Sequence, residues 1–85
     1  MLVTIAKKHT LNSDYANIFG CPLYRAIMEQ YPEFPLSFVG VGCVFLKNGK
    51  ELLFNYTHWN GDINRKLRRG DVGNVILEIS EPENM

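Results

Sequence analysis

The sequence predicts an α+β fold in which two helices pack on one face of a small, mostly antiparallel sheet. The main observation is the pair Asn48-Gly49, which is typical of a tight hairpin turn and lies between β-rich runs at residues 38–46 and 52–56. Each side of this hairpin offers one helical segment and one further β-rich segment. The predicted element order is therefore β-α-β(β)-β-α-β, where (β) marks a strand that glycines can divide.

The first twenty residues predict a strand followed by a helical turn. Residues 2–5 predict a strand with Val3 and Ile5 on one face and Leu2 and Thr4 on the other. A cluster of capping residues then predicts a short helical turn over residues 15–19. Gly20 is expected to end that turn, because glycine readily adopts the left-handed conformation found after helices.

The first full helix is expected to begin at Pro22, because proline suits the first helical position. Apolar residues then recur on one helical face, and we expect Leu23, Ile27 and Tyr31 to pack onto the sheet. Pro32 is incompatible with continuation of the helix and is expected to end it.

A second helix and a last strand are expected in the C-terminal third. Either Asn60 or Asp62 can cap the helix, and Gly70 is expected to end it. Residues 75–79 are rich in β-branched and apolar side chains and predict the last strand. The apolar edge of the helix repeats at every fourth residue: Trp59, Ile63 and Leu67.

The segment Gly40-Val41-Gly42 interrupts the β-rich run before the hairpin turn. Glycine inside a strand usually marks a bulge, a bend or a turn. Either one long strand bends here, or a strand over residues 36–39 turns into a second over residues 43–46, and we favour the turn. A dinucleotide-binding motif needs a third glycine and a following helix, which this segment lacks.

Length and composition indicate a single domain over residues 1–80, followed by a short polar tail at residues 81–85. Apolar residues make up 46% of the 85, enough for a folded core. No apolar run approaches the roughly 20 residues needed to span a bilayer, so we expect no membrane partner. Because Lys7 and Lys8 follow the first apolar residues, the reverse of a signal peptide, we expect a cytoplasmic protein with free thiols.

Nine basic and nine acidic residues give zero net charge, which opposes general attraction to nucleic acid or to anionic membranes. The charges are nevertheless clustered. A basic run near the end of the second helix can contact phosphates or an acidic protein face. The structural interpretation, which we favour, is that cations in a last helical turn are stabilised by the helix dipole. This run comprises Arg65, Lys66, Arg68 and Arg69.

Cys21 is the best candidate for a reactive side chain, because a helix N-terminus lowers the pKa of a thiol. The alternative, which we favour, is a small buried residue that packs beneath the helix. Nucleophilic catalysis needs a nearby base, and nothing in the sequence brings His9 or His58 to Cys21. The two cysteines and two histidines also lack the paired spacing of a zinc site. We therefore expect no enzymatic activity, no cofactor and no metal.

Several segments together resemble a group of small accessory proteins of tailed phages and prophages. The helix opening CPLYRA at residues 21–26 is followed by a Val39-Gly40 step, a hairpin that ends in an aromatic strand, the helix DINRKLRRGDV at residues 62–72, and an alternating last strand. The resemblance covers residues 21–79. It implies a protein that binds and blocks host machinery, including CRISPR and other defence systems, and it implies no catalytic residues.

The exit of the hairpin offers aromatic side chains that we expect to be partly exposed, where they make good binding anchors. A stacking surface like that of RNA-binding βαββαβ domains is not indicated, because their consensus motif is absent. We expect a non-enzymatic protein that docks on a host protein or nucleoprotein complex, with direct nucleic-acid binding through the basic run as the alternative. The candidate partner-binding residues are Tyr56, His58, Trp59, Arg65, Lys66, Arg68 and Arg69.

Overall fold

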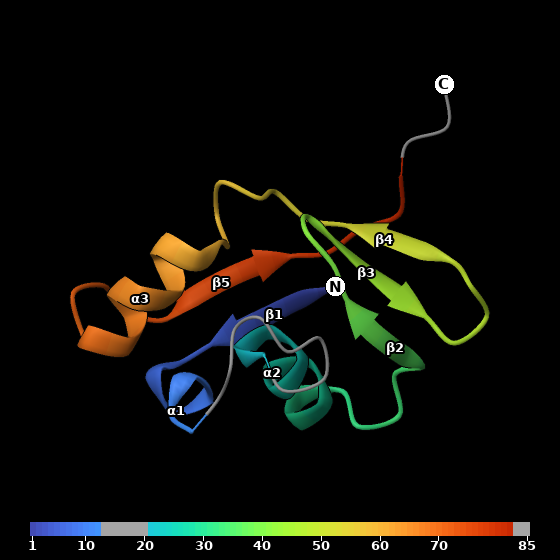
Figure 1. The fold of residues 1–85 in the computed structure, drawn as a ribbon. Helices are drawn as coiled ribbons and strands as arrows, with labels where there is room; N and C mark the ends of the chain where they lie inside the picture. Colours follow the sequence, from blue (N-terminus) through green and yellow to red (C-terminus); the bar gives the residue numbers. More distant parts are fainter. Residues whose placement is uncertain (13–20, 83–85) are drawn as a thin grey trace.

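The computed structural model describes residues 1–12 and 21–82, and this part of the chain forms an α+β domain, as predicted (Figure 1). The strands are β1 (Leu2–Ile5), β2 (Leu36–Val39), β3 (Cys43–Leu46), β4 (Glu51–Leu53) and β5 (Val75–Glu78). The helices are α1 (Lys7–Thr10), α2 (Pro22–Gln30) and α3 (Gly61–Arg69). None of these helices is long and apolar enough to cross a membrane. The helical turn expected over residues 15–19 lies outside the described residues.

The strands pair antiparallel, as predicted, but they form two small sheets. One sheet pairs β1 with β5, and the other has the order β2-β3-β4. Among the described residues a single bridge joins the sheets: Leu53 donates a backbone hydrogen bond to Ser80 at 2.8 Å and accepts one from it at 2.9 Å. The strand expected over residues 52–56 is shorter, because β4 ends at Leu53.

Glycine sets the turns on both sides of β3. At the Asn48-Gly49 hairpin turn, Gly49 has a positive φ of 86°, a conformation that side chains with a Cβ rarely adopt. Between β2 and β3, Gly42 has a φ of 73°, and the Gly40 N–H donates to the Cys43 carbonyl at 2.9 Å. The hairpin is therefore confirmed, and so is the favoured alternative of a turn between two strands.

The core lies between α2 and the sheets, and α2 contacts both β1 and β2. Leu23 and Ile27 are fully buried, as predicted. The prediction for Tyr31 is wrong, because α2 ends at Gln30 and Tyr31 leaves the helical conformation with 37% of its surface exposed. Its hydroxyl instead donates to the Leu2 carbonyl at the edge of β1, at 2.6 Å.

The short helix α1 was not predicted from the sequence. A single turn is too short to show a helical period. The Ala6 N–H donates to His9 Nδ1 at 2.9 Å, so that a buried histidine caps the start of the turn. The Arg25 guanidinium of α2 donates to the carbonyls of His9 and Leu11 at 3.1 and 2.6 Å, and these bonds satisfy the end of the turn.

Candidate binding surface

Trp59 is a core residue, with 1% of its surface exposed, so the expectation that it is partly exposed is wrong. The cause is a turn at Asn55, whose carbonyl accepts backbone hydrogen bonds from His58 at 2.9 Å and Trp59 at 3.4 Å. This turn leaves Tyr56 and His58 at the surface and buries the indole immediately before α3. Tyr56 is 48% exposed and is the aromatic side chain of this segment that a partner can reach.

Local capping chemistry defines α3. Asn60 is the N-cap, and its Oδ1 accepts a hydrogen bond from the Ile63 N–H at 3.0 Å. Gly70 ends the helix in the left-handed conformation, and its N–H donates to the Leu67 carbonyl at 3.1 Å. Leu67 is buried at 1% exposure, so the charged residues on both sides of it face solvent. The sequence prediction for this helix is confirmed, with Asn60 as the cap.

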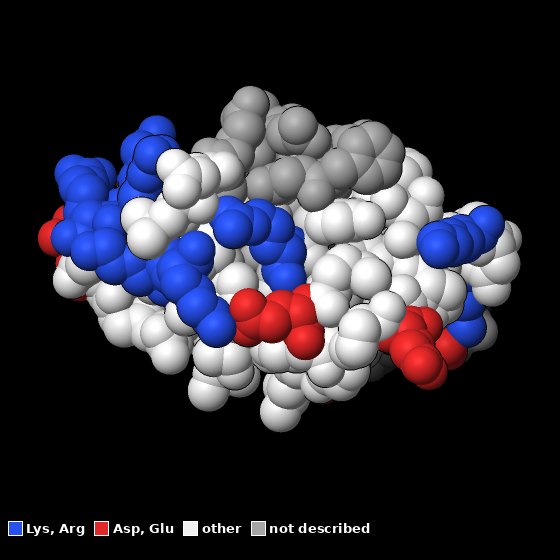
Figure 2. Space-filling model, turned by 90° about the horizontal axis from the view of Figure 1, so that it is seen from below, with Lys and Arg blue, Asp and Glu red and all other residues white. Residues whose placement is uncertain are grey.

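Packing of α1 against α3 joins two basic clusters that are far apart in the sequence. The Lys7 ammonium lies beside Gly70, at the C-terminus of α3, where the helix dipole favours positive charge. Figure 2 shows Lys and Arg side chains gathered over one end of the molecule. We call this surface the basic end, and it comprises Lys7, Lys8, Arg65, Lys66, Arg68 and Arg69.

Carboxylates lie among the cations of α3. Asp62 Oδ1 is 3.5 Å from Arg65 Nη2, and Asp62 Oδ2 is 3.3 Å from Lys66 Nζ. The Lys66 ammonium, and secondarily Arg65, lowers the pKa of Asp62 below its ordinary value. Arg69 Nε lies 3.8 Å from Asp71 Oδ2. All these groups are exposed, so the pairs orient the side chains but contribute little to stability.

The α1 side of the basic end is held by Glu29 of α2. Lys8 Nζ and His9 Nε2 lie 3.0 and 3.2 Å from the same Glu29 oxygen. The hydrogen bond from Lys8, followed by the contribution of His9, lowers the pKa of Glu29. Lys7 and Arg68 form no ion pair with any described residue, so their charges are the most available to a partner.

Charge is therefore distributed unevenly over the molecule. The basic end holds six cations and the three carboxylates paired with them, which gives this surface a net charge of +3. Because the whole chain is neutral, the remaining residues carry a net charge of −3. A molecule with zero net charge can thus present a strong local field at one end.

Cys21 has the surroundings of a structural residue. It is the N-cap of α2, it is 3% exposed, and its Sγ accepts a hydrogen bond from the Tyr24 N–H at 3.4 Å. Burial raises the pKa of the Cys21 thiol, and this effect exceeds the lowering by the N–H groups of the helix. Among the described residues, no group of three or more His, Cys, Asp or Glu side chains is placed to hold a metal ion.

We expect Cys21→Ala to lower the free energy of unfolding by about 1–2 kcal/mol, because it removes both a buried side chain and a helix cap. Cys21→Ser should cost less, since the serine hydroxyl is a better cap. Urea unfolding followed by circular dichroism measures both changes. A folded Cys21→Ser protein that has lost its biological activity would contradict the structural assignment and indicate thiol chemistry.

The predicted partner-binding residues do not form one patch. Tyr56 and His58 precede α3, whereas Lys66, Arg68 and Arg69 occupy its last turn. A nine-residue helix is about 14 Å long, so the two groups lie at opposite ends of it. The adjacency of α1 and α3 extends the basic part of the surface with Lys7 and Lys8. Comparisons with family models, with curated proteins and with solved structures found no match to this chain.

Proposed function

We propose that this protein is a non-enzymatic binding protein that docks through its basic end on a protein or nucleoprotein complex. The observation that carries the proposal is the convergence of six cations from α1 and α3 on a chain with no net charge. Such a divided charge orients the molecule during an encounter and favours a partner with an acidic face.

A protein face is a better match to the basic end than bare nucleic acid. Four of the six cations are already paired with carboxylates, which a closely approaching phosphate backbone would repel. Mixed charge of this kind suits a protein surface that also offers hydrogen-bond donors. Direct nucleic-acid binding is the second candidate. It is favoured by Lys7 and Arg68, which form no ion pair with a described residue.

The resemblance to small phage accessory proteins supports a more specific role. We propose that the chain is a phage-encoded or prophage-encoded inhibitor of a host defence complex, of the anti-CRISPR or a similar type, and that it acts in the host cytoplasm. In this role the basic end covers an acidic face that the host complex needs for its own function. The inhibitor then needs no catalytic residue, since occupancy of that face is sufficient.

The test is a Lys7→Glu/Arg68→Glu double variant. It reverses the charge of the two residues of the basic end that form no ion pair with a described residue. We expect its affinity for protein partners captured from bacterial lysate to fall roughly tenfold or more, because charge reversal slows association and adds repulsion. The matched control is Lys47→Glu/Lys50→Glu at the β3–β4 hairpin, which makes the same change of net charge away from the basic end. Equal loss of affinity in both variants would contradict the assignment of the surface.

A second measurement distinguishes the two candidate functions. We expect the unmodified chain to bind generic duplex DNA or RNA weakly at low salt in a gel-shift titration. Sub-micromolar binding that the Lys7→Glu/Arg68→Glu variant loses would support the nucleic-acid alternative. In that case the slope of log affinity against log salt should also decrease by about 2, one for each phosphate contact removed.

A further inference from the structure

The backbone hydrogen bonds at the end of β5 show which residues face each side of this strand. Ile79 exchanges two bonds with Met1, at 2.8 and 2.9 Å, on the side of β1. Ser80 exchanges two bonds with Leu53, at 2.9 and 2.8 Å, on the opposite side. Residues of an antiparallel strand alternate in this way, so every second residue of β5 directs its N–H and C=O away from β1.

Ile76 and Glu78 are the β5 residues that face away from β1. The register supports this assignment, because Thr4 lies opposite Ile76 and turns its own backbone groups away from β5. The Thr4 N–H donates to Gln30 Oε1 at 2.9 Å, and its carbonyl accepts from Gln30 Nε2 at 2.7 Å. The outer edge of β1 is thus covered by a side-chain amide. The outward backbone groups of Ile76 and Glu78 have no hydrogen-bond partner among the described residues.

The chain leaves this edge of β5 open by turning away from it. Leu53 forms a bridge with Ser80, just after β5. If the chain continued from Leu53 as a strand alongside β5, Asn55 would lie opposite Glu78 and Thr57 opposite Ile76. Instead Asn55 Oδ1 accepts hydrogen bonds from the Thr57 N–H at 2.9 Å and the Thr57 hydroxyl at 2.7 Å. The Asn55 carbonyl also accepts the His58 N–H at 2.9 Å. These local bonds turn the chain toward α3, so that no strand of residues 1–12 or 21–82 lies on this side of β5.

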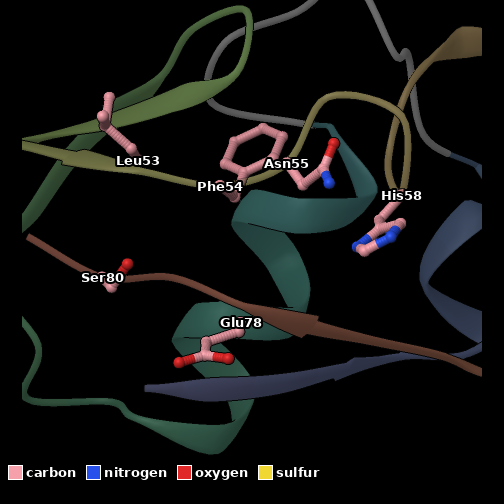
Figure 3. Close-up of a pocket in the computed structure, with 6 residues that line it drawn as sticks. All are labelled: Leu53, Phe54, Asn55, His58, Glu78 and Ser80. Atoms are coloured by element: carbon pink, nitrogen blue, oxygen red, sulfur yellow. The ribbon is translucent and has the colours of Figure 1, made fainter. Parts of the chain in front are cut away.

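Two hollows lie along the open edge. The first, of about 440 Å³, has a mixed polar and apolar lining that includes Asn55 and His58 on one side and Glu78 and Ser80 on the other (Figure 3). The second, of about 490 Å³, has an apolar lining that includes Ile63, Val72, Val75 and Ile76. His58 lines both hollows, so they adjoin. We call the two hollows together the β5 groove.

We propose that the β5 groove binds an extended peptide segment of a partner protein, which adds to β5 as an antiparallel strand. Backbone hydrogen bonds to Ile76 and Glu78 provide affinity, and side chains in the two hollows provide specificity. This surface shares no residue with the basic end, so the inference is independent of the function proposed above.

The chemistry of the groove specifies the peptide. Glu78 is exposed and forms no ion pair with a described residue, so its carboxylate selects a lysine or arginine opposite it. Ile76 is 66% exposed at the rim of the apolar hollow and selects an apolar side chain opposite it. In an antiparallel strand the residue opposite Glu78 comes first. The expected motif is therefore a cation, any residue, and then an apolar residue.

A second copy of this chain does not suit the groove. Asn55 and His58 lie across the first hollow from Glu78 and Ser80, and Thr57 lines the second hollow, so these three residues form a wall opposite β5. The β5 strand of a second copy carries β1 at its side, and this pair of strands would meet the wall. A single extended peptide that begins opposite Glu78 meets no such obstacle, because only the position opposite Ser80 is taken, by Leu53.

Hydrogen exchange of the free protein is the first test. We expect the amides of Ile76 and Glu78 to exchange at least tenfold faster than the amide of Leu77, which bonds to β1. Protection of Ile76 and Glu78 equal to that of Leu77 would show that the edge is already paired and would overturn the proposal. Sedimentation measures the oligomeric state at the same concentration, and a dimer with protected Ile76 and Glu78 would assign the edge to a second copy.

The second test titrates the full chain with a blocked peptide, Lys-Thr-Ile-Thr-Ser, which begins opposite Glu78 because Leu53 already pairs with Ser80, and follows amide shifts by NMR. We expect binding with a Kd on the order of 10⁻⁴ M, typical of a few hydrogen bonds and one charge pair, and slower exchange at Ile76 and Glu78. A control peptide with Glu in place of Lys should bind at least fivefold more weakly. Shifts at the basic end, with none at β5, would overturn the proposal.

Variants of β5 make this test specific. Ile76→Pro removes the outward N–H without removing a bond to β1, so it should abolish peptide binding while Leu77 stays protected. Glu78→Lys should reverse the preference between the Lys and Glu peptides, whereas Glu33→Lys, with the same net charge, should not change it. Undiminished binding to a folded Ile76→Pro protein, or an unchanged preference in Glu78→Lys, would contradict strand addition at this edge.

Discussion

Trp59→Ala is expected to lower the free energy of unfolding by about 3–5 kcal/mol, because it removes the largest fully buried side chain of the described core. A small domain of this size has a total stability of only about 5–10 kcal/mol, so the variant should lose a large fraction of that stability and unfold at a much lower urea concentration. The indole lies just before the N-cap of α3, and its loss should release that helix from the core. Urea unfolding followed by far-ultraviolet circular dichroism measures the change.

Two control variants separate a core role from a binding role. Tyr56→Ala removes an exposed aromatic side chain three residues earlier and should change stability by less than about 0.5 kcal/mol. Trp59→Phe keeps much of the buried apolar area and should be intermediate. The assignment would be wrong if Trp59→Ala stayed as stable as the unmodified chain but lost its partner, since that is the behaviour of an exposed anchor.

Features that depend on a few neighbouring residues could be predicted from the sequence. The Asn48-Gly49 turn, the Asn60 cap and the Gly70 end of α3 all follow from local backbone chemistry. The buried positions of Leu23 and Ile27 follow from the helical period. Each of these features is determined by residues close together in the sequence. The sequence was therefore sufficient to predict them.

Features that the apolar pattern alone does not determine could not be predicted. The apolar period of α3 includes Trp59, but the same period occurs whether that side chain is exposed or buried. The turn at Asn55 determines that Trp59 is buried. The exposure of Tyr31 follows from the end of α2 one residue earlier than the apolar stripe suggests. Alternation in β5 indicates a strand but does not reveal that, in the described part of the chain, β5 pairs with a strand along one edge only.

The candidate site shows the same division. Arg65, Lys66, Arg68 and Arg69 were evident as a basic run, and their exposure follows from the burial of Leu67 between them. Their proximity to Lys7 and Lys8 depends on the packing of α1 against α3, which brings together segments far apart in the sequence. No sequence pattern within either segment encodes that contact.

Ile27→Ala is expected to destabilise the protein by about 2–5 kcal/mol, because Ile27 is fully buried on the face of α2 that packs against both sheets. The two sheets share one bridge, between Leu53 and Ser80, so α2 is a main connection between them. Loss of this packing should therefore unfold both sheets in one transition. The conservative variant Ile27→Val removes one methylene group and should cost about 0.5–1.5 kcal/mol.

Hydrogen exchange at one buried amide of each sheet decides whether the domain unfolds as a unit. Val3 belongs to the sheet of β1 and β5, and Val44 belongs to the sheet of β2, β3 and β4. Both side chains are fully buried, so both amides should be strongly protected in the unmodified protein. In Ile27→Ala we expect their opening free energies to fall by the same amount. If Val44 kept its protection while Val3 lost it, the sheets would be separate folding units, and residues 1–80 would not form the single cooperative domain that the sequence predicts.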